Sequence, residues 1–244
     1  MPTGPVVDWA NPNVGLGCGT IHTYDPRTKA VKLLTTLPVM GNRGSGDELV
    51  KNEEGLLGIV TDPKFTENGW VYVYWMPHAS IDREKRVGER TISRFTYDRA
   101  AGVLDLNSRK DLLKFPVQIH SCCHAGGGMA FDAQGNLYVG SGDNNSSEGS
   151  SGYSGNNWTK EYAGISFQDA RRTSGNTNDL AGKIIRIHPE ADGTYTIPQQ
   201  PVPAGNDKAR PEIYVMGVRN ISRLQIDEER NWLTAAGSGR TRPR

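Results

Sequence analysis

The sequence lacks an excess of charge of either sign. Its 244 residues carry 28 Lys and Arg against 27 Asp and Glu, which leaves a formal net charge of +1. A protein that binds nucleic acid through its phosphates is usually strongly basic. The balanced charge therefore argues against a nucleic-acid-binding protein and fits an ordinary soluble composition, in which 36% of the residues are hydrophobic and 8% aromatic.

Cysteines and long apolar runs are also scarce. Three cysteines, two of them adjacent at Cys122 and Cys123, do not form the framework of a small disulfide-rich domain. The longest apolar runs, such as residues 56–60, are far shorter than the roughly 20 residues that a membrane-spanning helix needs, so we expect no span. Residues 1–5 have neither the basic start nor the apolar segment of a secretory signal.

Helical periodicity is missing too, because Gly or Pro interrupts every stretch of a dozen residues that could show it. The chain is instead rich in glycine, with 29 Gly and 14 Pro spread along its length. Alternating apolar residues flank turns of Asp, Asn and Gly, a pattern typical of β-hairpins. We expect hairpins at 56–63 with 70–75, 128–132 with 137–140, and 222–227 with 231–233, a looser one around 21–26, and strands at 91–97, 183–187 and 212–216.

Hairpins repeated at irregular spacing, none able to bury its own apolar face, predict an all-β fold of the β-propeller type with insertions between blades. A β-sandwich is the alternative on pattern alone. The polar stretch 144–178 is too long for a hairpin loop, and its aromatic residues Trp158 and Tyr162 favour an ordered excursion over a linker. We therefore treat residues 1–244 as one domain.

The densest group of reactive side chains lies at 120–128, where two His and two Cys precede three glycines. Adjacent cysteines do not match the spacing of structural zinc sites, so a buried thiol pair or a vicinal disulfide is favoured over zinc for Cys122 and Cys123. His124 could act as a general base at a strand entrance if Asp143 fixed its tautomer. The alternative is a hydrogen-bonded structural histidine. The three glycines would let a ligand or another strand approach the backbone.

Arg219 and Asn220 follow the predicted strand 212–216. The planar donor fork of Arg suits carboxylate or quinone oxygens, and Asn both donates and accepts hydrogen bonds. A solvent-exposed turn is the alternative. Neither a phosphate-binding loop at Gly182-Lys183 nor a dinucleotide-binding loop at 15–19 is predicted, because the glycine spacing is wrong in each.

Together these stretches resemble the glucose/sorbosone dehydrogenase family from about Gly17 to about Leu233. The resemblance rests on Glu54-Gly55-Leu56-Leu57-Gly58-Ile59, Asp62-Pro63-x-Phe65, Asn68-Gly69-x-Val71-Tyr72, His124-x-Gly126-Gly127, Phe131-Asp132, Gly135-Asn136-Leu137-Tyr138-Val139, Gly142-Asp143-Asn144, Asn178-Asp179-Leu180-x-Gly182-Lys183-Ile184-x-Arg186-Ile187, Pro211-Glu212-Ile213-Tyr214 and Gly217-x-Arg219-Asn220. Ile221 departs from the pattern, because most relatives have Pro there.

The resemblance implies a six-bladed propeller that binds pyrroloquinoline quinone (PQQ) and oxidises an aldose sugar at its anomeric carbon. It implies that His124 is the base, that Asp143 orients it, and that Arg219 polarises the quinone oxygen. Asn220 would help to hold the cofactor, and Glu53 falls near the position where relatives contact sugar. An external cytochrome or quinone would receive the electrons, and the parent protein would be extracellular or periplasmic.

The C-terminal residues 237–244 depart from the family pattern. Relatives continue there into a loop whose carbonyls bind the Ca²⁺ that seats the quinone, whereas this chain reads Gly-Ser-Gly-Arg-Thr-Arg-Pro-Arg. We interpret the tail as a frameshifted reading of that loop. On this hypothesis the chain is an incomplete propeller of roughly four blades that lacks the Ca²⁺ loop, and its unpaired strand edges favour association.

Two other functions remain open at this point. One is a non-catalytic propeller that binds carbohydrate or protein, in which His124 and Arg219 only satisfy hydrogen bonds. The other is a calcium-dependent propeller hydrolase such as a lactonase, for which the sequence shows no converging set of acidic or amide ligands.

Overall fold

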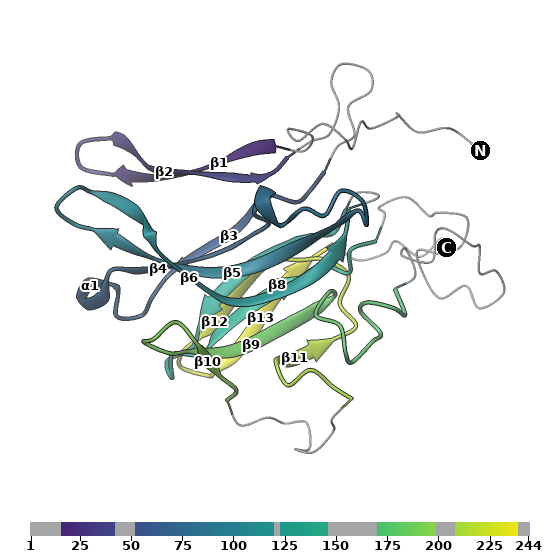
Figure 1. Cartoon of the computed structure of the whole chain (residues 1–244). Helices are drawn as coiled ribbons and strands as arrows, with labels where there is room; N and C mark the ends of the chain where they lie inside the picture. The colour runs from purple at the N-terminus through teal and green to yellow at the C-terminus, as the bar shows by residue number, and fades with distance from the viewer. Residues whose placement is uncertain (1–15, 42–51, 120–122, 146–169, 199–207, 239–244) are drawn as a thin grey trace.

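The computed structural model describes residues 16–41, 52–119, 123–145, 170–198 and 208–238, and nearly all of its regular structure is β-strand (Figure 1). The two helices within these residues, α1 (Phe65–Asn68) and the 3-10 helix η2 (His78–Ser80), are single turns. The strands are β1 (Leu16–Asp25), β2 (Ala30–Met40), β3 (Leu56–Thr61), β4 (Trp70–Trp75), β5 (Val87–Asp98), β6 (Val103–Gln118), β7 (Gly126–Phe131), β8 (Leu137–Ser141), β9 (Lys183–Pro189), β10 (Tyr195–Thr196), β11 (Ile213–Met216), β12 (Ile221–Asp227) and β13 (Trp232–Gly237). Among the described residues, no helix is long and apolar enough to cross a membrane.

These strands form four antiparallel sheets. The chain first makes the hairpin β1-β2 and then the four-stranded sheet β3-β4-β5-β6, in which each strand pairs with the next along the chain. The third sheet has the order β10-β9-β8-β7, with β11 also paired to β9, and the fourth is the hairpin β12-β13. Every hairpin and strand expected from the sequence is present, whereas β2, β6 and the two-residue β10 were not predicted.

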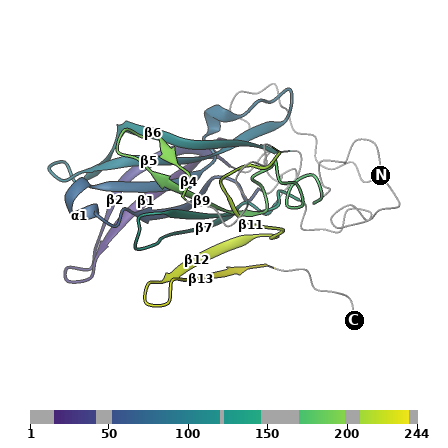
Figure 2. The same ribbon diagram turned by 90° about the horizontal axis from the view of Figure 1, so that it is seen from below.

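The sheets stack side by side as successive blades, which identifies an incomplete β-propeller (Figures 1 and 2). The first strand of each later sheet packs against the first strand of the next, so that β3 lies beside β7 and β7 beside β12. In Figure 2 the β12-β13 hairpin forms a separate layer below β7. The predicted all-β fold is confirmed. Two sheets of four or more strands and two hairpins correspond to roughly four blades.

Three glycines let the central strand β7 approach both neighbours. A Cβ atom on Gly127 would lie 2.5 Å from the carbonyl oxygen of Leu57 in β3, and one on Gly128 would lie 2.8 Å from the backbone of Arg223 and Leu224 in β12. On the β3 side, a Cβ on Gly58 would overlap the carbonyl of Gly127. Of the two explanations open for the run 126–128, the approach of other strands is therefore the one that the structure supports.

The hairpin turns repeat one hydrogen-bonded device. In the β3-β4 hairpin, Asp62 accepts from the side chain of Asn68 at 2.9 Å and from the hydroxyl of Tyr72 at 3.2 Å. In the β7-β8 hairpin, Asp132 accepts from the backbone and side-chain nitrogens of Asn136, both at 2.8 Å, and from the hydroxyl of Tyr138 at 3.2 Å. An Asp that caps the turn and also binds a strand Tyr fixes the register of each hairpin.

The apolar core lies between the sheets. One cluster joins the β3–β6 sheet to the β7–β10 sheet, and a second joins the β1-β2 hairpin to the β3–β6 sheet. Full burial of each large apolar side chain stabilises the fold by about 1.5–3 kcal/mol, so these clusters hold neighbouring blades together. The fully buried members include Tyr72, Ile92, Val139 and Ile185 in the first cluster and Val73, Trp75 and Phe95 in the second.

Candidate active site

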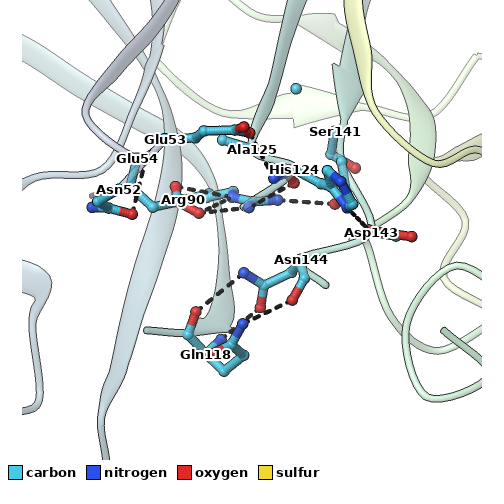
Figure 3. A network of polar contacts seen from close by, with 12 residues as sticks. Asn52, Glu53, Glu54, Arg90, Gln118, His124, Ala125, Ser141, Asp143 and Asn144 are labelled. Atoms are coloured by element: carbon cyan, nitrogen blue, oxygen red, sulfur yellow. Dashed lines mark hydrogen bonds and ion pairs between the residues drawn. The ribbon is translucent and has the colours of Figure 1, made fainter. Parts of the chain in front are cut away.

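His124 lies just before β7, in a conformation that histidine rarely adopts. Its φ of 61° places it in the left-handed region, and its side chain is only 3% exposed. Left-handed backbone costs an L-residue roughly 1–2 kcal/mol, so surrounding contacts must hold it. One of these is the carboxylate of Glu53, whose Oε2 accepts a hydrogen bond from the backbone N–H of His124 at 2.6 Å (Figure 3).

The imidazole of His124 is paired with Asp143 at the far end of the β7-β8 hairpin. Nδ1 of the ring lies 2.7 Å from Oδ1 of Asp143, which is 6% exposed. Because an ionised carboxylate only accepts hydrogen bonds, Nδ1 carries the proton of this bond, and in the neutral ring Nε2 is then the nitrogen with the free lone pair. The same Oδ1 accepts from the backbone N–H of Asn145 at 3.1 Å, which fixes the carboxylate. A histidine paired in this way can act as a general base while the aspartate holds its tautomer.

Arg219 and Asn220 join the same site from the turn before β12. The backbone carbonyl of Arg219 accepts from the N–H of Asp143 at 2.7 Å, and Oδ1 of Asn220 accepts from the N–H of Gly126 at 2.9 Å. The guanidinium of Arg219 donates to Oγ of Ser238 at 3.1 Å. The structure therefore brings Glu53, Asp143 and Asn220 to the segment around His124, whereas Arg219 reaches it through its backbone carbonyl and its guanidinium contacts Ser238.

The sequence did not point to the buried ion pair between Arg90 and Glu54. Arg90 is fully buried and donates to the carboxylate of Glu54 and to the backbone carbonyls of His124 and Gly142 (Figure 3). Arg90 shares a face of β5 with Ile92, which is buried, and this is the only local sign that Arg90 is buried too. Its partner is 36 residues away, so the pairing has no signature in sequence spacing.

Lys183, at the start of β9, ties a nearby loop to the site. Its Nζ donates to the carbonyl oxygens of Thr173, Ser174 and Ala181 at 2.8–3.2 Å, and burial lowers the pKa of Lys183 to about 8. The preceding Gly182 donates its N–H to the carbonyl of Gly142 at 2.9 Å. Residues 170–182 are thereby anchored beside Asp143.

Several expectations fall wholly or partly outside the described residues. Cys123 is disulfide-bonded and Cys18 is free and exposed, while Cys122 is outside them. Most of the polar stretch 144–178, including Trp158 and Tyr162, is outside them too, as are the residues after Ser238. Within the part of the chain that the structure describes, no three His, Cys, Asp or Glu side chains gather as metal ligands.

Comparison with known proteins gives a family. A model of the glucose/sorbosone dehydrogenase family matches residues 18–242, nearly the whole chain.

Solved structures share the fold at low sequence identity. A glucose dehydrogenase crystal structure matches with a TM-score of 0.62 and 19% identity over 93% of this chain and 52% of its own. The soluble aldose sugar dehydrogenase of Escherichia coli, in its apo-form, matches with a TM-score of 0.62 and 17% identity over 91% and 52% of the two chains. The PQQ-bound aldose sugar dehydrogenase of Streptomyces coelicolor matches with a TM-score of 0.55 and 24% identity over 91% and 51%. The chain thus spans about half the length of these structures, and on the match of the family model it belongs to the glucose/sorbosone dehydrogenase family.

Proposed function

We propose that this chain carries the proton-transfer half of a sugar-oxidising site, in a PQQ-dependent aldose dehydrogenase that oxidises the anomeric carbon. The observation that carries the proposal is the buried pair of His124 and Asp143, with Nδ1 and Oδ1 2.7 Å apart. The family membership supports the reaction class, and the PQQ-bound state of one similar structure supports the cofactor.

In this mechanism Nε2 of His124 takes the proton from the hydroxyl group on the anomeric carbon as that carbon loses hydride and becomes a carbonyl. Asp143 keeps the Nδ1 proton in place and stabilises the imidazolium that forms. Burial of both side chains keeps water from competing for the base and strengthens their electrostatic interaction. The base acts in the transition state, where the hydroxyl becomes acidic, and so accelerates the reaction itself.

Arg219 and Asn220 are the residues with donors suited to the cofactor. The quinone and carboxylate oxygens of PQQ accept hydrogen bonds, and a guanidinium has five N–H donors. Among the described residues the guanidinium of Arg219 makes one hydrogen bond, to Ser238, and Asn220 uses Oδ1 but not its amide N–H groups. The donor set therefore fits an acidic quinone. When bound, PQQ supplies the acceptor for the hydride.

The remaining expectations belong to the same proposal. Glu53, whose Oε2 binds the backbone of His124, has its second oxygen available to a sugar hydroxyl. Ca²⁺ would be needed to seat the quinone, and an external cytochrome or quinone would reoxidise it. The protein would work outside the cytoplasm, in the periplasm or beyond the cell.

A dye-linked assay tests the proposal. A full-frame version of the chain, which restores the Ca²⁺ loop, is supplied with PQQ, Ca²⁺ and a panel of aldoses, and the reduction of an electron-acceptor dye is followed, while quenching of protein fluorescence reports quinone binding. We expect dye reduction that requires both quinone and aldose. Quinone binding without dye reduction for any sugar would contradict the proposal and favour a non-catalytic binding module.

A further inference from the structure

The ion pair of Arg90 and Glu54 lies next to His124, and its geometry is unusually complete (Figure 3). Arg90 comes from β5, while Glu54 precedes β3 by two residues. The guanidinium donates from Nε to both carboxylate oxygens at 3.1 Å and from Nη2 to Oε1 at 2.6 Å. A buried ion pair is weak evidence for stability, because desolvation offsets much of the attraction between the charges. The other contacts of Arg90 therefore decide what the pair does.

Those contacts are with the backbone that carries the dyad of His124 and Asp143. Nη2 of Arg90 donates to the carbonyl oxygen of His124 at 3.1 Å. Nη1 donates to the carbonyl oxygen of Gly142, the residue that precedes Asp143, at 3.0 Å. One planar guanidinium thus binds the backbone at both ends of the dyad, and the rigid fork of Arg fixes the distance between them.

The two backbone segments share this guanidinium. The carbonyl oxygens of His124 and Gly142 both accept from Arg90, and each also accepts from one backbone N–H, that of Asn144 at 3.3 Å and that of Gly182 at 2.9 Å. The approach is close, because a Cβ atom on Gly142 would overlap the carbonyl of His124. His124 also has a left-handed φ of 61°, which it would leave if its contacts were lost.

We propose that Arg90, held by Glu54, is a positioning residue that sets the geometry of the His124–Asp143 dyad; this rests on the proposed function, in which that dyad is the base. Arg90 acts only through the two carbonyl groups and touches neither the imidazole nor substrate. Glu54 orients the guanidinium and neutralises its charge. Arg90 can therefore stay buried without a second anionic partner.

The clamp keeps its charge across the working pH range. Burial opposes the charged form of Arg90, but the carboxylate of Glu54 outweighs this and raises the pKa of the guanidinium above its ordinary value. The neighbouring Tyr74 does not compete as a charged group, because burial raises the pKa of its phenol. Arg90 therefore remains a cation beside the dyad.

Arg94 provides a matched control on the same strand. It is four residues from Arg90, on the same face of β5, and is 4% exposed. Its guanidinium also donates to two backbone carbonyls, those of Glu190 at 2.8 Å and Ala191 at 2.9 Å, but these lie at the β9-β10 turn and not at the dyad. Loss of Arg94 removes a similar buried arginine and leaves the dyad untouched.

The test is nuclear magnetic resonance of the chain labelled with ¹⁵N-histidine. The resonance of the Nδ1-bound proton of His124 is identified by its disappearance in His124→Asn, and its dependence on the carboxylate by Asp143→Asn. The spectrum is then recorded for Arg90→Met, Arg90→Lys and Arg94→Met, each with its melting temperature. Because Lys keeps the charge but lacks the donor fork, Arg90→Lys is the variant that retains the fold best.

We expect the Nδ1 proton signal to be lost or displaced in Arg90→Met and Arg90→Lys, and to keep its wild-type position in Arg94→Met even where that variant melts earlier. In the dye-linked assay Arg90→Lys should lower kcat by about 10²-fold with KM nearly unchanged, as expected for a displaced base. An unchanged Nδ1 signal in folded Arg90→Lys would overturn the inference.

The two proposals fail separately. If the wild-type chain oxidises no sugar but its Nδ1 signal depends on Arg90 and not on Arg94, the function is wrong and the clamp stands. If the chain is active and Arg90→Lys leaves both signal and kcat unchanged, the function stands and the clamp is wrong.

Discussion

The backbone N–H of Asp143 donates to the backbone carbonyl of Arg219 at 2.7 Å. The side chain of the same aspartate accepts from Nδ1 of His124. Asp143 therefore joins the proposed base to the segment proposed to bind the quinone, and it does so with two different groups. A side-chain substitution removes one connection and leaves the other.

Asp143→Asn separates these connections. An amide can turn its NH₂ group toward Nδ1 and so favour the wrong histidine tautomer, whereas the backbone bond to Arg219 remains. We expect dye-linked turnover to fall by at least about 10²-fold while quinone affinity stays within about twofold, measured by fluorescence titration. A parallel loss of quinone binding would show that the carboxylate supports the fold of the site and not the base.

Gly142→Ala tests the close approach behind the dyad. The added methyl group overlaps the carbonyl of His124. We expect a loss of about 1–3 kcal/mol in the free energy of unfolding, the usual cost of overpacking, together with a large loss of turnover. The measurements are urea denaturation and the dye-linked assay.

Gly135→Ala is the control for that substitution. Gly135 lies at the distant β7-β8 turn with φ of 80°, and a Cβ atom there would lie 3.3 Å from its nearest neighbour, Cε1 of His188. Alanine there is strained by roughly 1–2 kcal/mol but does not touch the dyad, so turnover should survive. Equal turnover in the two variants would contradict the tight packing at Gly142.

The hairpins were predictable because their information is local. Asp62 and Asp132 each bind an Asn and a Tyr within ten residues, so alternation and turn chemistry sufficed to place β3-β4 and β7-β8. The unpredicted strands β2 and β6 contain Pro38 and Pro116, which are tolerated because each strand lies at a sheet edge. Edge position is a property of the whole fold and is not visible in a window of sequence.

The site residues likewise divide into those that the sequence could predict and those that only the whole fold reveals. His124, Asp143, Arg219, Asn220 and Glu53 were proposed from residue types and a family resemblance, and the structure brings them together except for the guanidinium of Arg219, while their roles stay predictions. Arg90 was missed because a buried charge is recognisable only with its partner, and Glu54 lies near it because β3 pairs with β4 and β4 pairs with β5. The sequence offered no reason to pair them.

Acid stability should depend on Glu212. Burial raises the pKa of this carboxyl group, but hydrogen bonds from Arg210 and Tyr195 outweigh that and lower it below its ordinary value of 4.5. The unfolded chain therefore takes up this proton first, so the stabilisation is complete above about pH 4.5 and is lost as the pH falls through and below that value.

Glu212→Gln removes that part of the pH dependence. The drop in the free energy of unfolding between pH 7 and pH 4, from urea denaturation, should be smaller in Glu212→Gln than in the wild type. Glu228→Gln, which changes an exposed carboxyl group, is the matched control. Identical drops in all three proteins would contradict the assignment.

Self-association should depend on Trp232. This residue is 67% exposed on β13, a strand that pairs only with β12 among the described residues. Exposed strand edges with large apolar side chains favour pairing with another chain. We expect Trp232→Lys to weaken association by about tenfold or more in sedimentation velocity across a concentration series.

Tyr24→Lys is the comparison, because Tyr24 is also an exposed aromatic residue, at the end of β1 next to its turn. Its replacement should leave association unchanged. A wild-type chain that is monomeric at every concentration would contradict the importance of the β13 edge.

His124→Asn tests the central claim most directly. Asn tolerates the left-handed backbone of this position, so the fold should survive while the ring is removed. The measurement is dye-linked aldose oxidation with saturating quinone and Ca²⁺, alongside quinone titration of the same protein. The account predicts that the wild type turns over and that His124→Asn binds quinone normally but is slower by about 10²–10⁴-fold. Undiminished oxidation by His124→Asn would contradict the assignment of His124 as the base.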